Sequence, residues 1–410
     1  MDIVFIHGNY PAQFRHLAAA LGQAGQHRVV FLTAREDAES QPIPGVMIRR
    51  FQLHRTPNAG THHYLLATEE AVLKGQAVLR ALHELVAEGI NPRLVISHGG
   101  MGLGLFVKDF LPDAVHIGLF EWYFRPETAR WLMAEFELDE QLLTRMRNLP
   151  ILEELESCDL GVVPTNWQKQ QFPAAFQNKL EVIFDGIDTS FFQPDASIDN
   201  RVVELRGGEL DQPLRIAPGQ RLLSYATRGM ETLRGFPEFL RSAAACLADD
   251  DNLQVVVAGR DVRAYSYGAP SHGGSWKQAM LAELGDFSGQ DRLHFMGLMP
   301  YVHYRSLLQR SNLHCYFTRP YVTSWSLFEA AACGARLCVN GGPVTEGVVV
   351  NASAVAWVDL DQPKSLAAAV MERLRDPKGT QRAALKPCYE LPVSLQHWQT
   401  LVNRCLTQSS

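Results

Sequence analysis

The sequence has no run of about 20 apolar residues, and it lacks the paired short cysteine spacings usual at metal sites, since Cys333 and Cys338 flank a turn into a strand. We therefore expect no membrane-spanning helix and no metal site. The seven cysteines are scattered, mostly within apolar patterns, which is typical of reduced, buried thiols in a cytoplasmic protein. The net charge of −6 provides no overall basic field, so nucleic acid is not expected as a partner. The first six residues enter a strand without a basic segment, so no signal peptide is expected.

Two long series of alternating strands and helices occupy most of the 410 residues. A chain of this length exceeds one ordinary core and suggests about two or three domains. The first series covers residues 1–195, and the second covers 221–390. The strands of both series are almost wholly apolar, which predicts parallel sheets covered by helices on both faces. The expected fold class is α/β, with two doubly wound, Rossmann-like domains.

A segment with weak periodicity separates the two series, and a single expected helix follows the second. Residues 193–220 hold three prolines and three glycines with weak periodicity, so we expect a linker over 196–220. A last helix is expected over 391–410, because apolar side chains recur on one stripe. The residues of that stripe are Trp398, Leu401, Val402 and Cys405. Doubly wound domains bind ligands at the carboxyl ends of their strands, so we expect a crevice between the two domains to hold the ligand.

The segment Tyr316–Asn340 predicts a nucleotide site in the second domain. It reads as a strand, a polar turn, a helix that begins near Ser324 or Ser326 and ends at Gly334, and another strand. Unpaired amides at the start of such a helix bind phosphate through hydrogen bonds and the helix dipole. Glu329 lies one to two turns into this helix, where a carboxylate can accept hydrogen bonds from ribose hydroxyls.

A pair of arginines follows the first strand of the second domain. Arg228 and Arg234 come just after the strand expected at Leu222–Tyr225, and two cations at a strand's carboxyl end suit a diphosphate. Gly229 and Gly235 let the backbone approach a ligand closely. The alternative is a solvated loop with two surface charges. The helix of Glu329 favours the diphosphate interpretation.

In the first domain, polar residues follow strands without a dinucleotide fingerprint. Gly8 has no Gly-x-Gly-x-x-Gly around it, which argues against a nicotinamide dehydrogenase. His98 ends a strand beside flexible glycines, so it can bind a sugar hydroxyl or orient an acceptor; a loop carbonyl is its alternative partner. Glu121 lies among aromatic residues that can stack on sugars or fill the core.

Three consecutive aspartates, Asp249 to Asp251, suggest a metal site, since closely spaced carboxylates can bind divalent cations. They precede the strand expected at Leu253–Ala258 and so lie at the amino end of the sheet, opposite the expected ligand crevice. We therefore interpret them as a solvated acidic turn. Since arginines are available for the phosphates, no metal ion is needed to neutralise the leaving group.

Five motifs together indicate a family. They are His-Gly-Asn-Tyr-Pro-Ala-Gln-Phe-Arg-His-Leu at 7–17, His-Gly-Gly-Met-Gly at 98–102, Phe-Asp-Gly-Ile-Asp at 184–188, the arginine loop and the helix of Glu329. In this order and spacing they span nearly the whole chain. The sequence resembles the retaining GT-B glycosyltransferases of family four, the bacterial group 1 type, most closely those of cell-surface polysaccharide and glycoconjugate assembly.

This resemblance implies a fold, an activity and a set of site residues. It implies a GT-B fold with the donor cleft between the domains and the last helix packed back on the first domain. It also implies hexosyl transfer from a nucleoside diphosphate sugar with retention and without a protein nucleophile. The candidate catalytic residues are Arg228, Arg234 and His98, and Glu121 is a candidate on the acceptor side. The candidate donor-binding residues are Gly8, Leu298, Met299, Tyr321, Thr323, Ser324, Trp325 and Glu329. Of these, the resemblance implies that Leu298 and Met299 contact the base through main-chain groups.

One position departs from the family pattern. Family members carry a glutamate that contacts the donor sugar eight residues before the ribose glutamate, and here that position is Tyr321. The ribose role carries over to Glu329, but the carboxylate contact with the sugar does not. A non-catalytic nucleotide-sugar-binding subunit, or a sugar-nucleotide epimerase of the same fold, therefore stays open as an alternative.

The expected partners follow from this interpretation. They are a nucleotide sugar, with uridine diphosphate favoured over guanosine diphosphate, and a glycan, lipid-linked or protein acceptor; no separate cofactor is expected. The expected location is the cytoplasm, where a peripheral contact with the inner face of the membrane stays open. The sequence leaves the base, the sugar, the acceptor and the oligomeric state undetermined.

Overall fold

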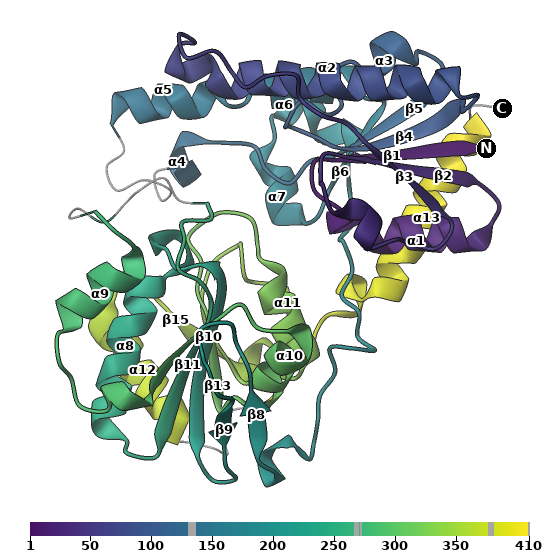
Figure 1. The fold of residues 1–410 in the computed structure, drawn as a ribbon. Coiled ribbons are helices and arrows are strands. Elements are labelled where there is room, and N and C mark those ends of the chain that lie inside the picture. Colours follow the sequence, from purple (N-terminus) through teal and green to yellow (C-terminus); the bar gives the residue numbers. More distant parts are fainter. Residues whose placement is uncertain (130–136, 266–269, 271–272, 376–380, 409–410) are drawn as a thin grey trace. The chain divides into compact units, whose positions relative to one another are not determined.

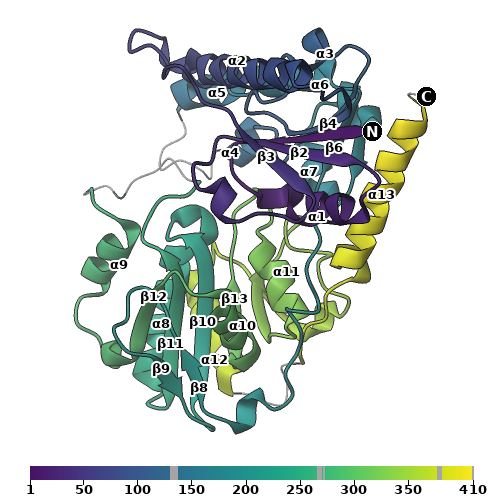
Figure 2. The same cartoon turned by 45° about the vertical axis from the view of Figure 1, so that its right-hand side comes forward.

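A computed structural model of the chain describes residues 1–129, 137–265, 270, 273–375 and 381–408. It contains two compact units. Unit 1 comprises Met1–Ala129, Glu137–Gly186 and Leu391–Ser410, and unit 2 includes Ile187–Glu390. Each unit has a parallel sheet with helices on both faces (Figures 1 and 2). The prediction of two Rossmann-like domains is confirmed.

Unit 1 is built on a seven-stranded sheet in the order β3-β2-β1-β4-β5-β6-β7, with every neighbouring pair parallel. The strands are β1 (Asp2–His7), β2 (Arg28–Thr33), β3 (Val46–Arg50), β4 (Pro92–His98), β5 (Val115–Leu119), β6 (Leu160–Val163) and β7 (Leu180–Val182). The order reverses at β1, where β2 and β4 lie on opposite sides. Polar residues that follow β1, β4 and β5 therefore meet at one edge of the sheet.

Helices cover both faces of this sheet. They are α1 (Arg15–Ala24), α2 (Leu66–Ala87), α3 (Val107–Phe110), α4 (Pro126–Ala129), α5 (Leu138–Met146), α6 (Leu149–Ser157), α7 (Asn166–Gln171) and α13 (Leu391–Gln408). One face packs against α1 and α13, and the other packs against α2 and α3 (Figure 2). The last helix places Trp398, Leu401, Val402 and Cys405 in the core of unit 1.

Unit 2 is built on a six-stranded parallel sheet in the order β12-β11-β10-β13-β14-β15. The strands are β10 (Arg221–Gly229), β11 (Leu253–Arg260), β12 (Leu293–Gly297), β13 (Leu313–Tyr316), β14 (Leu337–Asn340) and β15 (Val355–Val358). The helices are α8 (Phe236–Asp249), α9 (Trp276–Leu284), α10 (Tyr301–Arg310), α11 (Trp325–Ala332) and α12 (Pro363–Arg375). The order reverses at β10, which carries the arginine loop at its carboxyl end.

Residues 196–220, predicted to be a linker, are part of unit 2. They contain a two-stranded antiparallel sheet of β8 (Val203–Leu205) and β9 (Leu214–Ile216). Val203, Leu205 and Ile216 are buried and pack with Leu307 of α10. The prediction was wrong because strands of three residues are too short to show periodicity, while the prolines and glycines around them are typical of linkers.

None of the described helices combines the length and apolar character that crossing a membrane requires.

Candidate active-site residues

Arg234 is a buried cation at the carboxyl end of β10. The chain leaves β10, forms a short 3-10 helix (Thr232–Arg234) and turns into α8 at Gly235, whose φ of 63° suits glycine. The Arg234 side chain is only 5% exposed, and Nη1 donates to Thr318 Oγ1 at 2.7 Å and to the Val322 carbonyl at 3.1 Å. Over the ranges that the structure describes, the guanidinium of Arg234 contacts hydroxyls, a carbonyl and the Tyr265 ring, and it forms no ion pair with a carboxylate. Buried charges are normally paired, so this arrangement favours an anionic ligand.

Arg228 joins Arg234 around the ring of Tyr265. Arg228 Nη1 donates to the Tyr265 hydroxyl at 3.2 Å. The two guanidinium carbons lie 5.6 Å and 5.3 Å from the centroid of that ring, within the range of a cation–π interaction. Glu231 is fully buried and accepts hydrogen bonds from the amides of Ala264 and Tyr265, which ties the loop after β11 to the arginine loop. The two candidate arginines are thus brought together.

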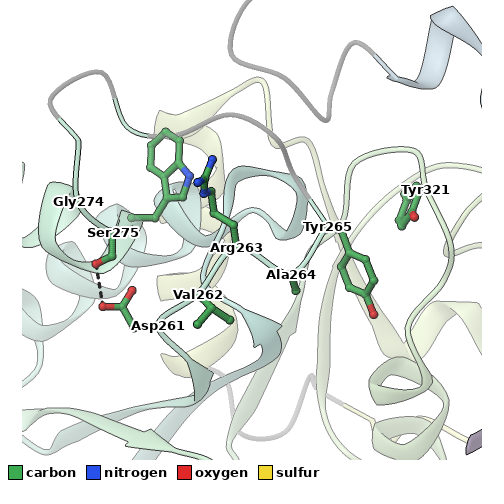
Figure 3. Close-up of a pocket in the computed structure, with 9 residues that line it drawn as sticks. Asp261, Val262, Arg263, Ala264, Tyr265, Gly274, Ser275 and Tyr321 are labelled. Carbon is green, nitrogen blue, oxygen red and sulfur yellow. Dashed lines mark hydrogen bonds between the residues drawn. The ribbon is translucent and has the colours of Figure 1, made fainter. Parts of the chain in front are cut away.

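Tyr321 lies beside this group, at a hollow of about 650 Å³. Its ring centroid is 5.6 Å from that of Tyr265. The hollow is lined by Asp261, Val262, Arg263, Ala264, Tyr265, Gly274, Ser275, Trp276 and Tyr321 (Figure 3). The lining mixes aromatic rings, a guanidinium and a carboxylate, and Asp261 accepts from the Ser275 hydroxyl at 2.7 Å. Of these lining residues, the sequence analysis identified Tyr321 but none of the others, since no motif marks them.

The start of α11 has the predicted cap, but part of it is already paired. Ser324 is the N-cap, and its hydroxyl accepts from the amide of Ser326 at 3.4 Å. The amide of Ser324 donates to the Tyr316 hydroxyl at 2.9 Å, and the hydroxyl of Thr323 donates to the Val344 carbonyl at 2.6 Å. These two donors therefore hold the turn in place. Trp325, the first residue of α11, is 37% exposed.

Glu329 is a buried carboxyl group on α11, only 8% exposed. Burial raises its pKa to about 7, and the neighbouring Tyr304 side chain opposes the rise. Burial and the charge of Glu329 in turn raise the pKa of Tyr304 well above its ordinary value. Glu329 therefore changes its protonation state near neutral pH. A ligand that donates hydrogen bonds would favour the ionised form.

The residues expected at the base, Leu298 and Met299, follow β12. The Leu298 side chain is 54% exposed, while Met299 packs against the core beneath β8 and β9. The Leu298 carbonyl accepts from the amide of Gly208 at 2.9 Å. The segment between β8 and β9 therefore already occupies the Leu298 carbonyl, which is one of the main-chain groups expected to contact the base.

In unit 1, His98 and Glu121 form a hydrogen-bonded pair. His98 ends β4, Glu121 follows β5, and Nε2 of His98 lies 3.1 Å from Oε2 of Glu121. Two residues that the sequence analysis left out of the site complete the group. Gln13 Nε2 donates to Glu121 Oε1 at 2.9 Å, and the ring of His7 lies 4.4 Å from that of His98 between centroids. A signal existed for His7, since it ends β1, the strand at which the sheet order reverses.

The electrostatics of this group separate its members. Burial and the neighbouring His98 lower the pKa of His7 to about 3, so this ring is neutral. Burial alone would raise the pKa of Glu121, but a hydrogen bond from His98 and another from Gln13 help to bring it below its ordinary value. Glu121 is therefore a carboxylate at neutral pH.

The glycines near these residues differ from the flexible glycines expected. At Gly8, a Cβ atom would have no heavy atom within 4 Å, so the backbone there is open. After His98, by contrast, a Cβ at Gly99 would lie 2.6 Å from Phe120, and one at Gly102 would lie 2.1 Å from the Ala71 carbonyl. This loop is tightly packed. It is also held by buried Glu154, which accepts from the amide of Gly102 at 2.6 Å.

The acidic turn Asp249–Asp251 lies at the amino end of the sheet of unit 2, between α8 and β11. Its three carboxylates form ion pairs with Arg375, Arg221 and Arg292. In the portion of the chain with described coordinates, no three His, Cys, Asp or Glu side chains gather in a way that could hold a metal ion.

Comparisons with known proteins bear on this geometry. Residues 25–192 match the model of the glycosyl transferase family 4 group. The match covers less than half of the chain and agrees with the family resemblance over those residues. Among solved structures, sucrose-phosphate synthase from Thermosynechococcus elongatus superposes with a TM-score of 0.70 at 15% identity, covering 100% of both chains. The fold is GT-B.

Two further GT-B structures cover nearly the whole chain. HepE from Anabaena, in complex with UDP and glucose, has a TM-score of 0.64 at 13% identity and covers 98% of this chain and 100% of its own. The catalytic domain of starch synthase IV from Arabidopsis thaliana, bound to ADP and acarbose, has a TM-score of 0.62 at 11% identity, with 99% of each chain covered. No curated relative matches the sequence.

Proposed function

We propose that the protein is a retaining glycosyltransferase that moves a hexose from a nucleoside diphosphate sugar to an acceptor hydroxyl. The observation that carries this proposal is Arg234, a buried cation without an ion-pair partner in the described parts of the chain, at a strand's carboxyl end. Arg228 lies against the same tyrosine ring, so the two guanidinium groups together suit a diphosphate. The family match supports the same activity.

The reaction breaks the bond between the anomeric carbon and the diphosphate oxygen and forms a bond from that carbon to the acceptor oxygen. The proton of the acceptor hydroxyl leaves with the diphosphate, and no protein nucleophile takes part. Negative charge develops on the diphosphate, where Arg228 and Arg234 would stabilise it. With two cations offered, the reaction needs no metal ion, and the protein needs no separate cofactor.

The remaining donor roles belong to the residues around these arginines. Glu329 would accept hydrogen bonds from the ribose hydroxyls, and the turn Thr323–Trp325 would place the start of α11 beside the phosphates. Tyr321, at the hollow beside Tyr265, would contact the donor sugar. Leu298 and Met299 would contact the base, with the exposed side chain of Leu298 available to it. In unit 1, Gly8 would allow close approach of the donor, and His98 and Glu121 would serve the acceptor.

The donor proposed is a uridine diphosphate sugar, because HepE of the same fold was solved with UDP and glucose. The acceptor is a glycan, a lipid-linked sugar or a protein in cell-surface polysaccharide or glycoconjugate synthesis. We place the reaction in the cytoplasm, and a peripheral contact with the inner face of the membrane stays open.

The test compares three proteins by calorimetric UDP binding and by UDP release from UDP-sugars with a mixed acceptor pool. They are the wild type, Arg234→Gln, and the control Arg241→Gln, which alters an arginine paired with Glu283 on the surface of α8. Losing a charge-assisted phosphate contact should weaken UDP binding by about 1.5–3 kcal/mol, or roughly ten- to a hundredfold. Wild-type UDP affinity in Arg234→Gln would refute the diphosphate assignment.

The same assay separates the alternatives. A binding subunit would bind UDP-sugars but release no UDP with any acceptor, and Tyr321→Glu would not restore release. An epimerase would convert the donor sugar without an acceptor. Transfer to an acceptor, detected by mass increase of the product, identifies the glycosyltransferase.

A further inference from the structure

A directed hydrogen-bond chain links the carboxyl ends of β1, β4 and β5 in unit 1. The amide of Asn9 donates to His7 Nδ1 at 2.9 Å, so this ring nitrogen carries no proton. The proton of the neutral ring is then on Nε2, which donates to Gln13 Oε1 at 3.0 Å. This fixes the orientation of the Gln13 amide, whose Nε2 donates to Glu121 Oε1 at 2.9 Å. In each of these hydrogen bonds, the donor and the acceptor are therefore fixed.

The other oxygen of Glu121 is held as well. Oε2 faces Nε2 of His98 at 3.1 Å, and since a carboxylate only accepts, His98 must be the donor. The main-chain carbonyl of Glu121 accepts from Gln168 Nε2 at 2.7 Å. The carboxylate is thus immobilised on both oxygens and at its backbone, while its lone pairs still exceed its bound donors.

The solvent exposure of each side chain shows which member of this hydrogen-bond chain a ligand can contact. His98 and His7 are 3% and 7% exposed, whereas the side chain of Glu121 is 31% exposed. His98, which the sequence analysis placed in a catalytic role, therefore lies beneath Glu121. A substrate that approaches this edge of the sheet meets the carboxylate, and the histidine acts through it.

We propose that Glu121 binds hydroxyl groups of a neutral sugar and that Gln13, His7 and His98 are positioning residues that fix this carboxylate. The proposal rests on the proposed glycosyltransferase function and adds the substrate chemistry of its acceptor side. A rigid, ionised carboxylate accepts hydrogen bonds from hydroxyls and repels phosphates and carboxylates. The group bound here is therefore the hydroxylated ring of an acceptor or of the donor sugar, and not the phosphate of a lipid carrier.

The decisive variant is Gln13→Glu, read through its pH profile. When the introduced carboxyl group is protonated, it can accept from His7 and donate to Glu121, as the glutamine does. When it ionises, two carboxylates face each other and the chain loses its central donor. Activity should therefore be close to wild type near pH 5 and at least tenfold lower at pH 8, relative to the wild type at each pH. Gln23→Glu, an exposed substitution on α1, is the control for added charge.

Glu121→Gln supplies the second measurement and separates the sources of the hydroxyls. It should raise KM for the sugar that Glu121 contacts by tenfold or more. A change confined to the acceptor's KM identifies the acceptor, and a change confined to the UDP-sugar's KM identifies the donor sugar. Affinity for UDP, which lacks a sugar ring beyond its ribose, should stay at the wild-type value.

Three outcomes would overturn the inference. A Gln13→Glu profile that parallels the wild type at all pH values would show that the chain does not position Glu121. Unchanged KM values in Glu121→Gln would show that Glu121 contacts no sugar. A wild-type protein that transfers no sugar would instead overturn the proposed function, and this sugar-binding role with it. Melting temperatures of all variants identify any that fail to fold.

Discussion

We expect the ionisation of the buried carboxyl group of Glu329 to change donor affinity and protein stability in opposite directions. Burial raises its pKa to about 7, and only the ionised form is a full acceptor for two ribose hydroxyls. If binding requires the carboxylate, affinity should follow its ionised fraction. That fraction is about 0.9 at pH 8 and about 0.01 at pH 5, so UDP binding through this group should weaken about a hundredfold between them.

The stability of the unliganded protein should change in the other direction. The folded pKa of Glu329 lies above its ordinary value of 4.5, so the native state binds the proton more tightly than the unfolded chain does. The stabilising contribution is complete below pH 4.5 and is lost as the pH rises through about 7. The full change corresponds to about 3 kcal/mol in the free energy of unfolding.

The assay uses the ratio of wild type to Glu329→Gln, because UDP phosphates and other buried groups titrate in the same range. Calorimetry at pH 5 and pH 8 gives the ratio of dissociation constants, and urea unfolding without UDP gives the difference in stability. The wild type should gain affinity and lose stability relative to the variant as the pH rises. Glu283→Gln, at a surface pair on α9, should show neither trend. A ratio that is flat in both experiments would refute the assignment of a neutral-range pKa to Glu329.

Three further predictions concern other parts of the chain. Burial raises the pKa of Glu154 to about 7, so wild-type stability relative to Glu154→Gln should fall by up to about 3 kcal/mol from pH 5 to pH 8; a constant difference in urea unfolding would contradict this. Full chelation of divalent ions should leave the transfer rate unchanged; a rate abolished by chelator and restored by Mg²⁺ or Mn²⁺ would show a metal requirement. Tyr321→Phe should alter selectivity among UDP-sugars by several-fold while UDP affinity holds, and loss of UDP affinity would remove Tyr321 from a sugar role.

The sequence predicted the helix of Glu329 and its flanking strands well, because their signals are local. A serine N-cap, an alanine-rich helix and a glycine stop specify α11 between two apolar strands, and a few residues of spacing place Glu329 on that helix. The position of Arg234 at the end of β10 follows in the same way. Its burial and its lack of an ion pair within the described ranges do not follow, since they depend on Thr318 and Val322, more than 80 residues away.

Non-local pairing explains what the sequence did not show. The contact of Gln13 with Glu121 joins residues 108 positions apart, and each residue alone resembles an ordinary polar side chain in a loop. The small sheet of β8 and β9 was missed for a related reason. Its stability comes from packing on Leu307 and from the Gly208–Leu298 hydrogen bond, neither of which leaves a pattern within residues 196–220.

Gly8 and Gly102 also differ in a way that the sequence does not show, since both glycines follow strands of unit 1 and look alike in the sequence. Gly102 has a φ of 88°, and a Cβ there would lie 2.1 Å from the Ala71 carbonyl. Gly8 has open space around it and no positive φ. Gly102 is therefore required by packing. Gly8 is not required by packing, so any need for it must come from a ligand that approaches the backbone.

Alanine substitutions test this distinction. Gly102→Ala should lower the free energy of unfolding by more than about 2 kcal/mol, because left-handed backbone strain adds to the clash. Gly8→Ala should leave stability unchanged or raise it by up to about 1 kcal/mol, since it restricts only the unfolded chain. If the donor approaches Gly8, this stable variant should nevertheless lose at least tenfold in kcat/KM, because a methyl group occupies the space of the ligand. Full activity in Gly8→Ala would show that this open backbone serves no ligand, and a destabilised Gly8→Ala would contradict the packing argument itself.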